Sequence, residues 1–390
     1  MTIAPARSLS RVGRALLGLG LVLGSAACSR HLDATRPPDA ARPLGPPGAP
    51  PPPGAPSPPP PGAPPEDDGP ITAAERTAVI DALTAALDQH YVFADKAKAL
   101  GKKLHDRQQH GAYASIARGQ AFAHALTEDM AALVHDKHLE VRYVEHAVEP
   151  PPADQPAAMD DDEAAEQRYL NHGVFEVRRM RFNLGYLNFN AFGRPMPTAD
   201  KLAAAMRLLA DTQSLIIDLR ECHGGDTDTV AMAQSYLLPA NTHMLDMYVR
   251  STNITTHVRA QAELAGPRYA AGKPVFVLIG EGTVSGCEAF AYAMQAQKRA
   301  TVIGGHSAGA AYFGDPVRLG DHFMAFVPIG RPIDPITHGD WEGTGVIPTI
   351  PAAPDQALAV AERASLALLE PKERNSRRRA AMQRRIAELH

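Results

Sequence analysis

The chain has 390 residues, of which 45% are hydrophobic and 21% charged, so it is long enough to bury a sizeable core. Its formal net charge of -4 and its pI near 6.5 give no electrostatic reason to expect a nucleic-acid partner, which usually needs a basic surface. Its three cysteines are too few for a disulfide framework, so a hydrophobic core must hold the fold.

Residues 1–28 follow the pattern of a secretory signal peptide, with a basic start and an apolar run from Ala15 to Leu23 that is too short to span a membrane. A cysteine after small residues resembles the lipobox of bacterial lipoproteins, although Ser25 stands where leucine is commoner. An ordinary secreted protein cut nearby is the alternative. We expect acylation of Cys28, which anchors the protein to a lipid bilayer of the cell envelope, at the bacterial outer membrane or periplasmic face.

Proline, glycine and alanine dominate the next segment, which has too few large apolar side chains to repay the entropy of ordering. We predict a disordered, proline-rich linker over residues 29–70 that tethers the folded part of the chain.

Residues 71–145 are predicted to form a small helical N-terminal domain. Thr72 and Glu75 have the spacing of a capping box at a helix start. Apolar residues then recur every three or four positions, at Ile80, Leu83 and Leu87 and again at Phe122, Leu126, Met130 and Leu133. The alternation from Leu139 to Tyr143 indicates a strand, so His138 should lie where the helical domain meets a sheet.

Residues 146–369 alternate strands with helices, which indicates an α/β catalytic domain. The runs Leu184–Phe189, Ser214–Leu219 and Pro274–Ile279 have strand character, and Lys201–Leu209 has helical character. We interpret the acidic run Asp160–Glu163 as a solvated loop, because consecutive carboxylates do not close a coordination sphere. The sequence predicts no metal and no cofactor.

Ser285 follows the third of these strands and precedes a helical segment. Unpaired amides and the helix dipole at such a turn can stabilise an oxyanion, which makes the amide of Gly286 a candidate donor. A simple helix cap is the alternative for the serine. Gly224 and Gly225 follow the second strand, where backbone amides can approach a ligand, although a tight turn would also explain them.

Four motifs in chain order match those of one known family. They are Asp136-Lys137-His138 for Asp-x-His, Asp218 to Gly225 for a glycine-rich loop, Ser285 to Glu288 for Ser-x-x-Glu, and Trp341 to Val346 for Trp-Glu-Gly-x-Gly-Val. They resemble the C-terminal processing (tail-specific) and tricorn-type serine peptidases, in the branch similar to interphotoreceptor retinoid-binding protein. The likeness covers residues 71–369 and implies a crotonase-like (ClpP/crotonase-type) catalytic domain.

The resemblance implies a serine-type peptidase that cleaves a peptide or protein substrate through an acyl-enzyme. Ser285 would be the nucleophile, His138 the base that takes its proton, and Glu342 the carboxylate that orients the histidine. Gly286, Gly224 and Gly225 would form the oxyanion hole.

Departures from the family's motifs narrow this interpretation. The segment Gly304–Ala311, where tail-specific members carry a catalytic lysine, has none, so a histidine triad is favoured over a serine-lysine dyad. Cys222-His223 replaces the usual Asn-Gly of the glycine-rich loop. His306 lies in residues 305–309, where the family more often has a run rich in threonine and glycine. The interval 144–179 is too short for a PDZ domain. A module that binds a retinoid-like or fatty-acid-like ligand, or an idle envelope protein on the same fold, remains the alternative.

The cysteines and the C-terminus complete the predictions. The motifs place Cys222 and Cys287 in one region, so an oxidising envelope could pair them, but we favour free thiols because disulfide geometry is narrow. We expect Cys287 to turn away from the serine and to be buried as a small apolar residue. The stretch from Lys372 to Arg385 has helical composition, and we interpret the basic residues 370–390 as a solvated tail, with contact to anionic lipid or cell wall as the alternative.

Overall fold

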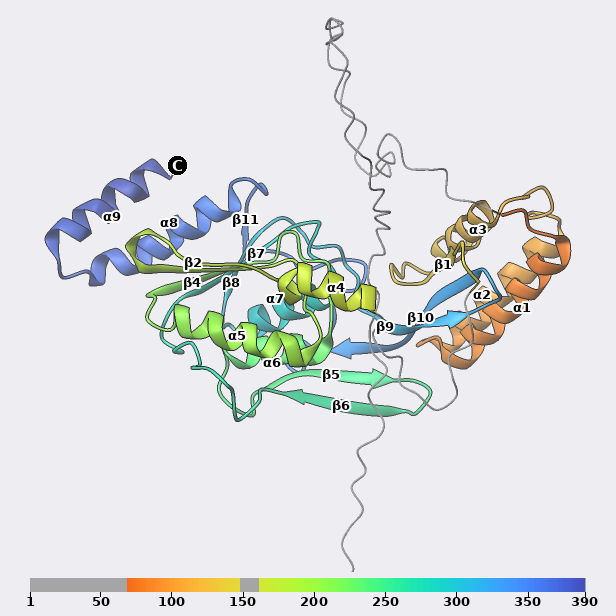
Figure 1. Ribbon diagram of the computed structural model, residues 1–390, viewed down its shortest axis with the longest axis horizontal. Coiled ribbons are helices and arrows are strands. Elements are labelled where there is room, and N and C mark those ends of the chain that lie inside the picture. Colours follow the sequence, from red (N-terminus) through yellow and green to blue (C-terminus); the bar gives the residue numbers. More distant parts are fainter. Residues whose placement is uncertain (1–68, 148–160, 390) are drawn as a thin grey trace, which may run out of the picture.

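The structure is a computed structural model that describes residues 69–147 and 161–389. The predicted signal peptide, Cys28, most of the predicted linker and the end of the predicted tail lie outside the described residues. None of the described helices is long and apolar enough to cross a membrane. The molecule is elongated, with the N-terminal helices at one end and the C-terminal helices at the other (Figure 1).

Three helices form the N-terminal end, namely α1 (Ala73–His90), α2 (Ala94–Gln109) and α3 (Gly119–Ala131). The predicted capping box is confirmed. The Glu75 amide donates to Thr72 Oγ1 at 3.2 Å, and the Thr72 amide donates to the Glu75 carboxylate at 2.7 Å. The predicted strand follows as β1 (Glu140–Tyr143), and His138 lies directly before it, as the sequence indicated.

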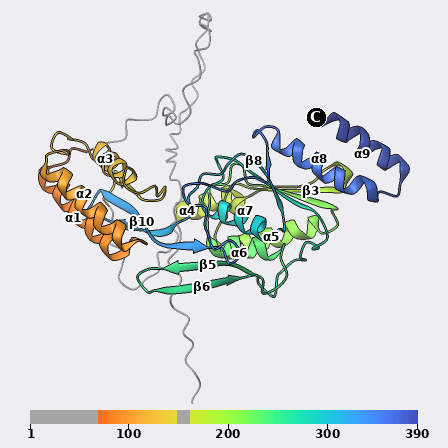
Figure 2. The same cartoon turned by 180° about the vertical axis from the view of Figure 1, so that it is seen from behind.

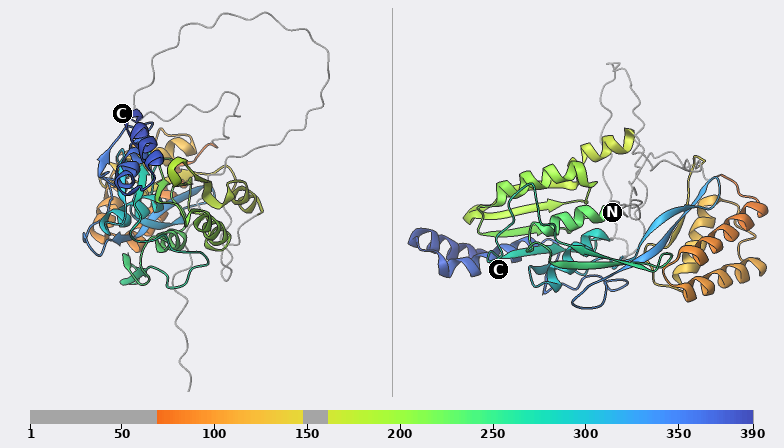
Figure 3. Two further views of the ribbon diagram at one scale, coloured as in Figure 1. Left: turned by 90° about the vertical axis from the view of Figure 1, so that its left-hand side faces the viewer. Right: turned by 90° about the horizontal axis from the view of Figure 1, so that it is seen from below.

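An antiparallel sheet joins this helical end to the rest of the molecule. Its strands are β1, β5 (His243–Val249), β6 (Ile254–Arg259), β9 (Phe313–Arg318) and the long β10 (Phe323–Ile333). The first part of β10 pairs with β1 and β9, and its last residues pair with β5. Seen from below, β10 runs between the helical end and the body (Figure 3).

The core under α1, α2 and α3 contains residues from both halves of the chain. Leu83, Leu87 and Phe122 pack in one cluster with Phe323 and Val327 of β10. A short helical unit cannot bury its apolar faces alone. It packs instead against β10, which lies about two hundred residues later in the chain. The helical unit and β10 therefore share one hydrophobic core. The predicted boundary between residues 145 and 146 stays a prediction as a domain limit.

The second sheet has six strands in the order β11-β8-β7-β4-β3-β2. They are β2 (Val174–Arg179), β3 (Leu184–Phe189), β4 (Ser214–Asp218), β7 (Val275–Ile279), β8 (Thr301–Gly304) and β11 (Ile350–Pro351). All neighbouring pairs of described strands are parallel except β2 with β3. The three predicted strands are β3, β4 and β7, which confirms the α/β core.

Helices cover both faces of this sheet, which explains why its central strands β4 and β7 are buried along their whole length. One face packs on α5 (Pro195–Leu209), α6 (Thr227–Ser235) and α7 (Gly286–Ala296), and the other packs on α8 (Ala357–Leu369). Short 3₁₀ turns, η1 (Asn171–Gly173) and η2 (Arg181–Asn183), flank β2.

One interpretation from the sequence is wrong. Asp161 to Glu163 of the acidic run, expected to be a loop, form the first turn of α4 (Asp161–Tyr169). The basic C-terminal segment forms η3 (Glu370–Lys372) and α9 (Ser376–Glu388), which lies beside α8 (Figure 2). Met382 is only 1% exposed and packs in one cluster with Leu366 and Leu369 of α8, and Arg385 pairs with Glu362 at 2.8 Å, so apolar contacts and ion pairs dock this helix.

Candidate active site

Ser285 lies at the turn between β7 and α7, as predicted. Its backbone has φ 53° and ψ -117°, a region that side-chain-bearing residues rarely adopt and that costs energy to maintain. The Ser285 amide donates to the carboxylate of Glu288 at 2.9 Å, which holds this turn in place. The strained turn projects the serine at the N-terminal end of α7, where the helix dipole favours negative charge.

Glu288 connects this turn to a second segment. Its side chain is fully buried and accepts hydrogen bonds from Ser307 Oγ at 2.6 Å and from the amides of Gly309 at 2.6 Å and Ala310 at 2.8 Å. Burial raises the pKa of Glu288, and the hydrogen bonds oppose that shift. The sequence marked Glu288 only as the end of a motif, and its tertiary role was not predicted.

Glu342 binds the next two residues of the segment that Glu288 binds, and it also binds the loop before β1. Its carboxylate accepts hydrogen bonds from three backbone amides, those of Lys137, Ala311 and Tyr312. Possible ligand atoms of Asp136, His138 and Glu342 all lie within 4.8 Å of one another. The structure therefore brings the predicted base and its predicted orienting carboxylate together.

Burial controls the protonation of this cluster. It lowers the pKa of His138 to about 4, raises that of Asp136 to about 6 and raises that of Glu342 to about 7. In the part of the chain that the structure describes, His138 Nδ1 is buried and has no hydrogen-bond partner. A buried neutral imidazole next to carboxylates is able to accept a proton and to be stabilised once it carries one.

Ser285 and His138 are not hydrogen-bonded to each other among the described residues. Ser285 lines a pocket together with Ala311, whose amide binds Glu342, and with Trp341, the residue before Glu342. Catalytic hydrogen bonds are often loose without substrate and tighten when it binds. Ser285 and His138 are therefore both connected to the segment of residues 309–312, through Glu288 and Glu342, without a hydrogen bond between them in the described part of the chain.

The pocket beside Ser285 is mainly apolar. Residues from α6, the β5–β6 hairpin, β9 and the loop before β11 form its walls, including Val230, Leu245, Met247, Val258, Phe313 and Trp341. The histidines of the two segments that depart from the family's motifs do not line this pocket. His306 lies at a separate hollow with Pro348, and His223 is exposed at the surface.

The predicted oxyanion hole needs one correction. The Gly224 amide donates to Cys287 Sγ at 3.1 Å, so it is not directed at the pocket. Gly224 serves instead as a close-approach position, because a Cβ atom there would lie 3.1 Å from the Cβ of Ser285 and its φ is +96°. Gly225 and Gly286 both line the pocket and remain the candidate donors.

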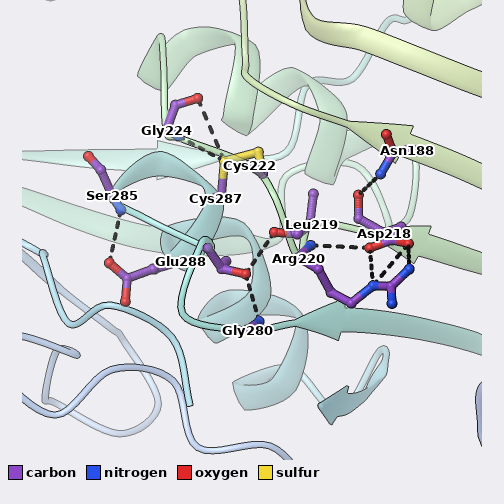
Figure 4. The surroundings of a disulfide bond; sticks show 11 residues. Asn188, Asp218, Leu219, Arg220, Cys222, Gly224, Gly280, Ser285, Cys287 and Glu288 are labelled. Atoms are coloured by element: carbon purple, nitrogen blue, oxygen red, sulfur yellow. Dashed lines mark hydrogen bonds and ion pairs between the residues drawn. A yellow bond between two sulfur atoms is a disulfide. The ribbon is translucent and has the colours of Figure 1, made fainter. Parts of the chain in front are cut away.

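Cys222 and Cys287 form a disulfide, so the expectation of free thiols is wrong (Figure 4). Both residues are fully buried, and their Cα atoms are 5.9 Å apart. The bond links the glycine-rich loop after β4 to the first turn of α7, two residues beyond Ser285. The loops meet because β4 and β7 are neighbours in the sheet, a pairing that cysteine spacing alone does not reveal.

Two protein-family models match the chain. The model described as peptidase family S41 matches residues 183–352, and the model described as the N-terminal domain of peptidase S41 in eukaryotic IRBP matches residues 72–178. The chain belongs to peptidase family S41. This confirms the family that the motifs indicated, and it makes the protein a serine-type peptidase.

Several solved structures are similar to this chain. Mature CPAF has a TM-score of 0.52 and 12% identity, over 76% of this chain and 98% of that one. A putative S41 protease from Bacteroides fragilis NCTC 9343 has a TM-score of 0.43 and 21% identity, over 48% of this chain and 52% of that one, so the match spans about half of its length. The photosystem II D1 C-terminal processing protease has a TM-score of 0.44 and 16% identity, over 73% of this chain and 94% of that one. At these identities the CPAF likeness supports the α/β fold alone.

Proposed function

We propose that this S41 peptidase hydrolyses peptide bonds through an acyl-enzyme, with Ser285 as nucleophile, His138 as general base and Glu342 as the orienting carboxylate. The observation that carries the proposal is the cluster of His138 and Glu342, which is held by the segment that also anchors the turn of Ser285 through Glu288.

Each residue has a role that follows from its surroundings. His138 takes the proton of the Ser285 hydroxyl as the serine oxygen attacks the carbonyl carbon of the substrate. The ionised carboxylate of Glu342 stabilises the imidazolium that results, and the amides of Gly286 and Gly225 donate to the oxyanion. His138 then gives its proton to the leaving amine, and water hydrolyses the acyl-enzyme by the same route.

The pocket beside Ser285 suits an apolar side chain of a peptide next to the scissile bond. Its walls include Leu245, Val258 and Trp341, which carry no charge that could pair with a charged side chain of a substrate. The same walls would suit a hydrophobic ligand, which is the carriage function considered from the sequence. We favour hydrolysis because Ser285 itself lines this pocket.

We further propose that the catalytic domain is crotonase-like and lacks a PDZ domain. Between β1 and β2 the described residues form only α4 and η1. We also propose that Cys28 is acylated, so that the linker holds the enzyme on a membrane of the cell envelope. That proposal rests on the signal-peptide pattern and the lipobox resemblance of residues 1–28.

The test is covalent labelling of the folded protein with a fluorophosphonate probe, with the modified residue mapped by mass spectrometry. We expect modification of Ser285 and its absence in Ser285→Ala. Turnover of peptide substrates by the wild-type protein should accompany the labelling. A folded protein that binds fatty acid in this pocket but neither reacts with the probe nor cleaves peptides would establish carriage instead.

A further inference from the structure

A second cluster of ligating side chains lies outside the candidate active site, on the hairpin of β5 and β6. It contains His243, Asp246 and His257, whose possible ligand atoms all lie within 4.8 Å of one another. His243 Nε2 lies 2.6 Å and His257 Nδ1 lies 2.5 Å from the same atom, Asp246 Oδ1. We propose that this cluster is a binding site for a divalent first-row transition-metal ion, and that zinc is the ion it takes.

The strand pairing explains why three residues of different spacing converge. Asp246 lies directly opposite His257 in the register of β5 and β6, so their side chains share one face of the hairpin. His243 is three positions before Asp246 and would point to the other face of a regular strand. A register shift between His243 and Leu245 inserts one extra residue, which turns His243 onto the face of Asp246.

The donor set favours zinc over hard cations. Two imidazole nitrogens and one carboxylate oxygen are the ligand types that zinc binds, with a fourth position open to water, whereas calcium and magnesium take oxygen ligands.

Little movement is needed to admit the ion. For metal–ligand distances of about 2.0–2.1 Å, tetrahedral geometry requires ligand atoms roughly 3.3 Å apart, so each imidazole must withdraw from Asp246 by less than about 1 Å. His257 is exposed and His243 is partly exposed, so both rings have room to turn. Their rings are already at an interplanar angle of 88° with centroids 5.3 Å apart, which leaves space between them.

The position of the cluster gives the ion a consequence for the candidate active site. Leu245 and Val258 form the neighbouring cross-strand pair, and both line the pocket of Ser285. Alternation along the strands places them on the opposite face of the hairpin from Asp246 and His257. A bound ion would therefore clamp the two strands behind one wall of the substrate pocket. This consequence for substrate binding rests on the proposed function, whereas binding of the ion does not.

The test is zinc titration of the whole mature protein by calorimetry after dialysis against a chelator. Because Asp136, His138 and Glu342 form the other described cluster of ligating residues, the titrations use a His138→Ala background. We expect one zinc ion per chain in that background, and a loss of affinity of about tenfold or more after His257→Ala or Asp246→Asn. His223→Ala, which removes an exposed histidine elsewhere, is the matched control and should leave zinc binding unchanged.

A second readout does not depend on peptidase activity. Cobalt bound in place of zinc should give the intense visible absorption of a tetrahedral site, and His257→Ala should abolish it. Unchanged zinc affinity in both His257→Ala and Asp246→Asn, or no zinc binding in the His138→Ala background, would overturn the proposal. Failure of the fluorophosphonate test with zinc binding intact would leave this site standing and refute only the proposed function.

Discussion

Glu288 and Glu342 accept hydrogen bonds from four consecutive amides of one segment, residues 309–312, two amides each. Glu288 also binds the amide of Ser285, and Glu342 binds the amide of the residue before His138. The relative positions of Ser285 and His138, the proposed nucleophile and base, are therefore set by two carboxylates that bind one backbone segment.

The first prediction concerns Glu288. Glu288→Ala should lower the free energy of unfolding by roughly 3 kcal/mol or more, because four buried donors lose their acceptor. It should also reduce kcat, since the strained turn of Ser285 loses the bond to its amide. Urea denaturation and steady-state kinetics measure both effects. Glu281→Gln, at an exposed position in the loop between β7 and α7, is the control and should change stability by less than about 0.5 kcal/mol. Wild-type stability and activity in Glu288→Ala would contradict the role assigned to this residue.

The second prediction treats Ser285, His138 and Glu342 as one unit. Ser285→Ala and His138→Ala should each remove nearly all turnover, and the double variant should lose little more. Glu342→Gln should be milder, because the oxyanion donors and part of the histidine orientation survive. Acylation rates on a generic ester substrate, measured on variants shown to be folded, decide the matter. If His138→Ala acylates at the wild-type rate, another base must act.

The third prediction is the pH dependence of kcat/KM. His138 must be neutral to accept a proton, and burial lowers its pKa to about 4, so activity should fall as the pH drops through about 4. Glu342 must be ionised to stabilise the imidazolium, and burial raises its pKa to about 7, so activity should also rise with pH through about 7. An unperturbed histidine would instead give a single limb near about 6.5.

Glu342→Gln separates these two limbs. The variant should lose the limb near pH 7, because glutamine does not titrate. It should keep the limb near pH 4, because His138 is unchanged. The profile is measured over the range in which circular dichroism shows that both proteins remain folded. A limb near pH 7 that persists in the variant would mean that Glu342 is not the group that produces it.

The fourth prediction concerns the disulfide. The bond closes a loop with a sequence separation of 65, for which loop-closure entropy predicts a stabilisation of about 4 kcal/mol. Cys222→Ser with Cys287→Ser should lose a stabilisation of that order and reduce activity, because the glycine-rich loop is no longer tied to α7. Alkylation of the denatured, unreduced protein followed by mass spectrometry tests the bond itself. Alkylation at Cys222 and Cys287 before reduction would show that the bond is absent.

The fifth prediction concerns the N-terminus, which lies outside the described residues. We expect the mature protein from a bacterial host to begin at Cys28, to carry acyl chains there and to partition into membranes. Mass spectrometry of the N-terminal peptide and membrane fractionation measure these outcomes, and Cys28→Ser should release the protein into the soluble fraction. A mature terminus that is unmodified at another residue would refute the anchor.

Local patterns were enough to predict the elements that carry the site. The capping box of α1, the strands β3, β4 and β7 and the turn at Ser285 follow from hydrophobic periodicity and helix-start chemistry, which act over a few neighbouring residues. The motifs around His138, Ser285 and Glu342 were also visible, because each is contiguous in sequence. Periodicity likewise identified a helical N-terminal unit, but it did not identify the strand β10, whose residues complete the core of that unit.

Only the tertiary structure decided how these pieces meet. The hydrogen bonds of Glu288 and Glu342 to residues 309–312 join segments that are distant in sequence, and no spacing rule predicts such contacts. The same reason explains the disulfide of Cys222 with Cys287, which depends on β4 and β7 being neighbours in the sheet. The shifted pKa of His138 is a further example, because burial is a property of the assembled core and not of the local sequence.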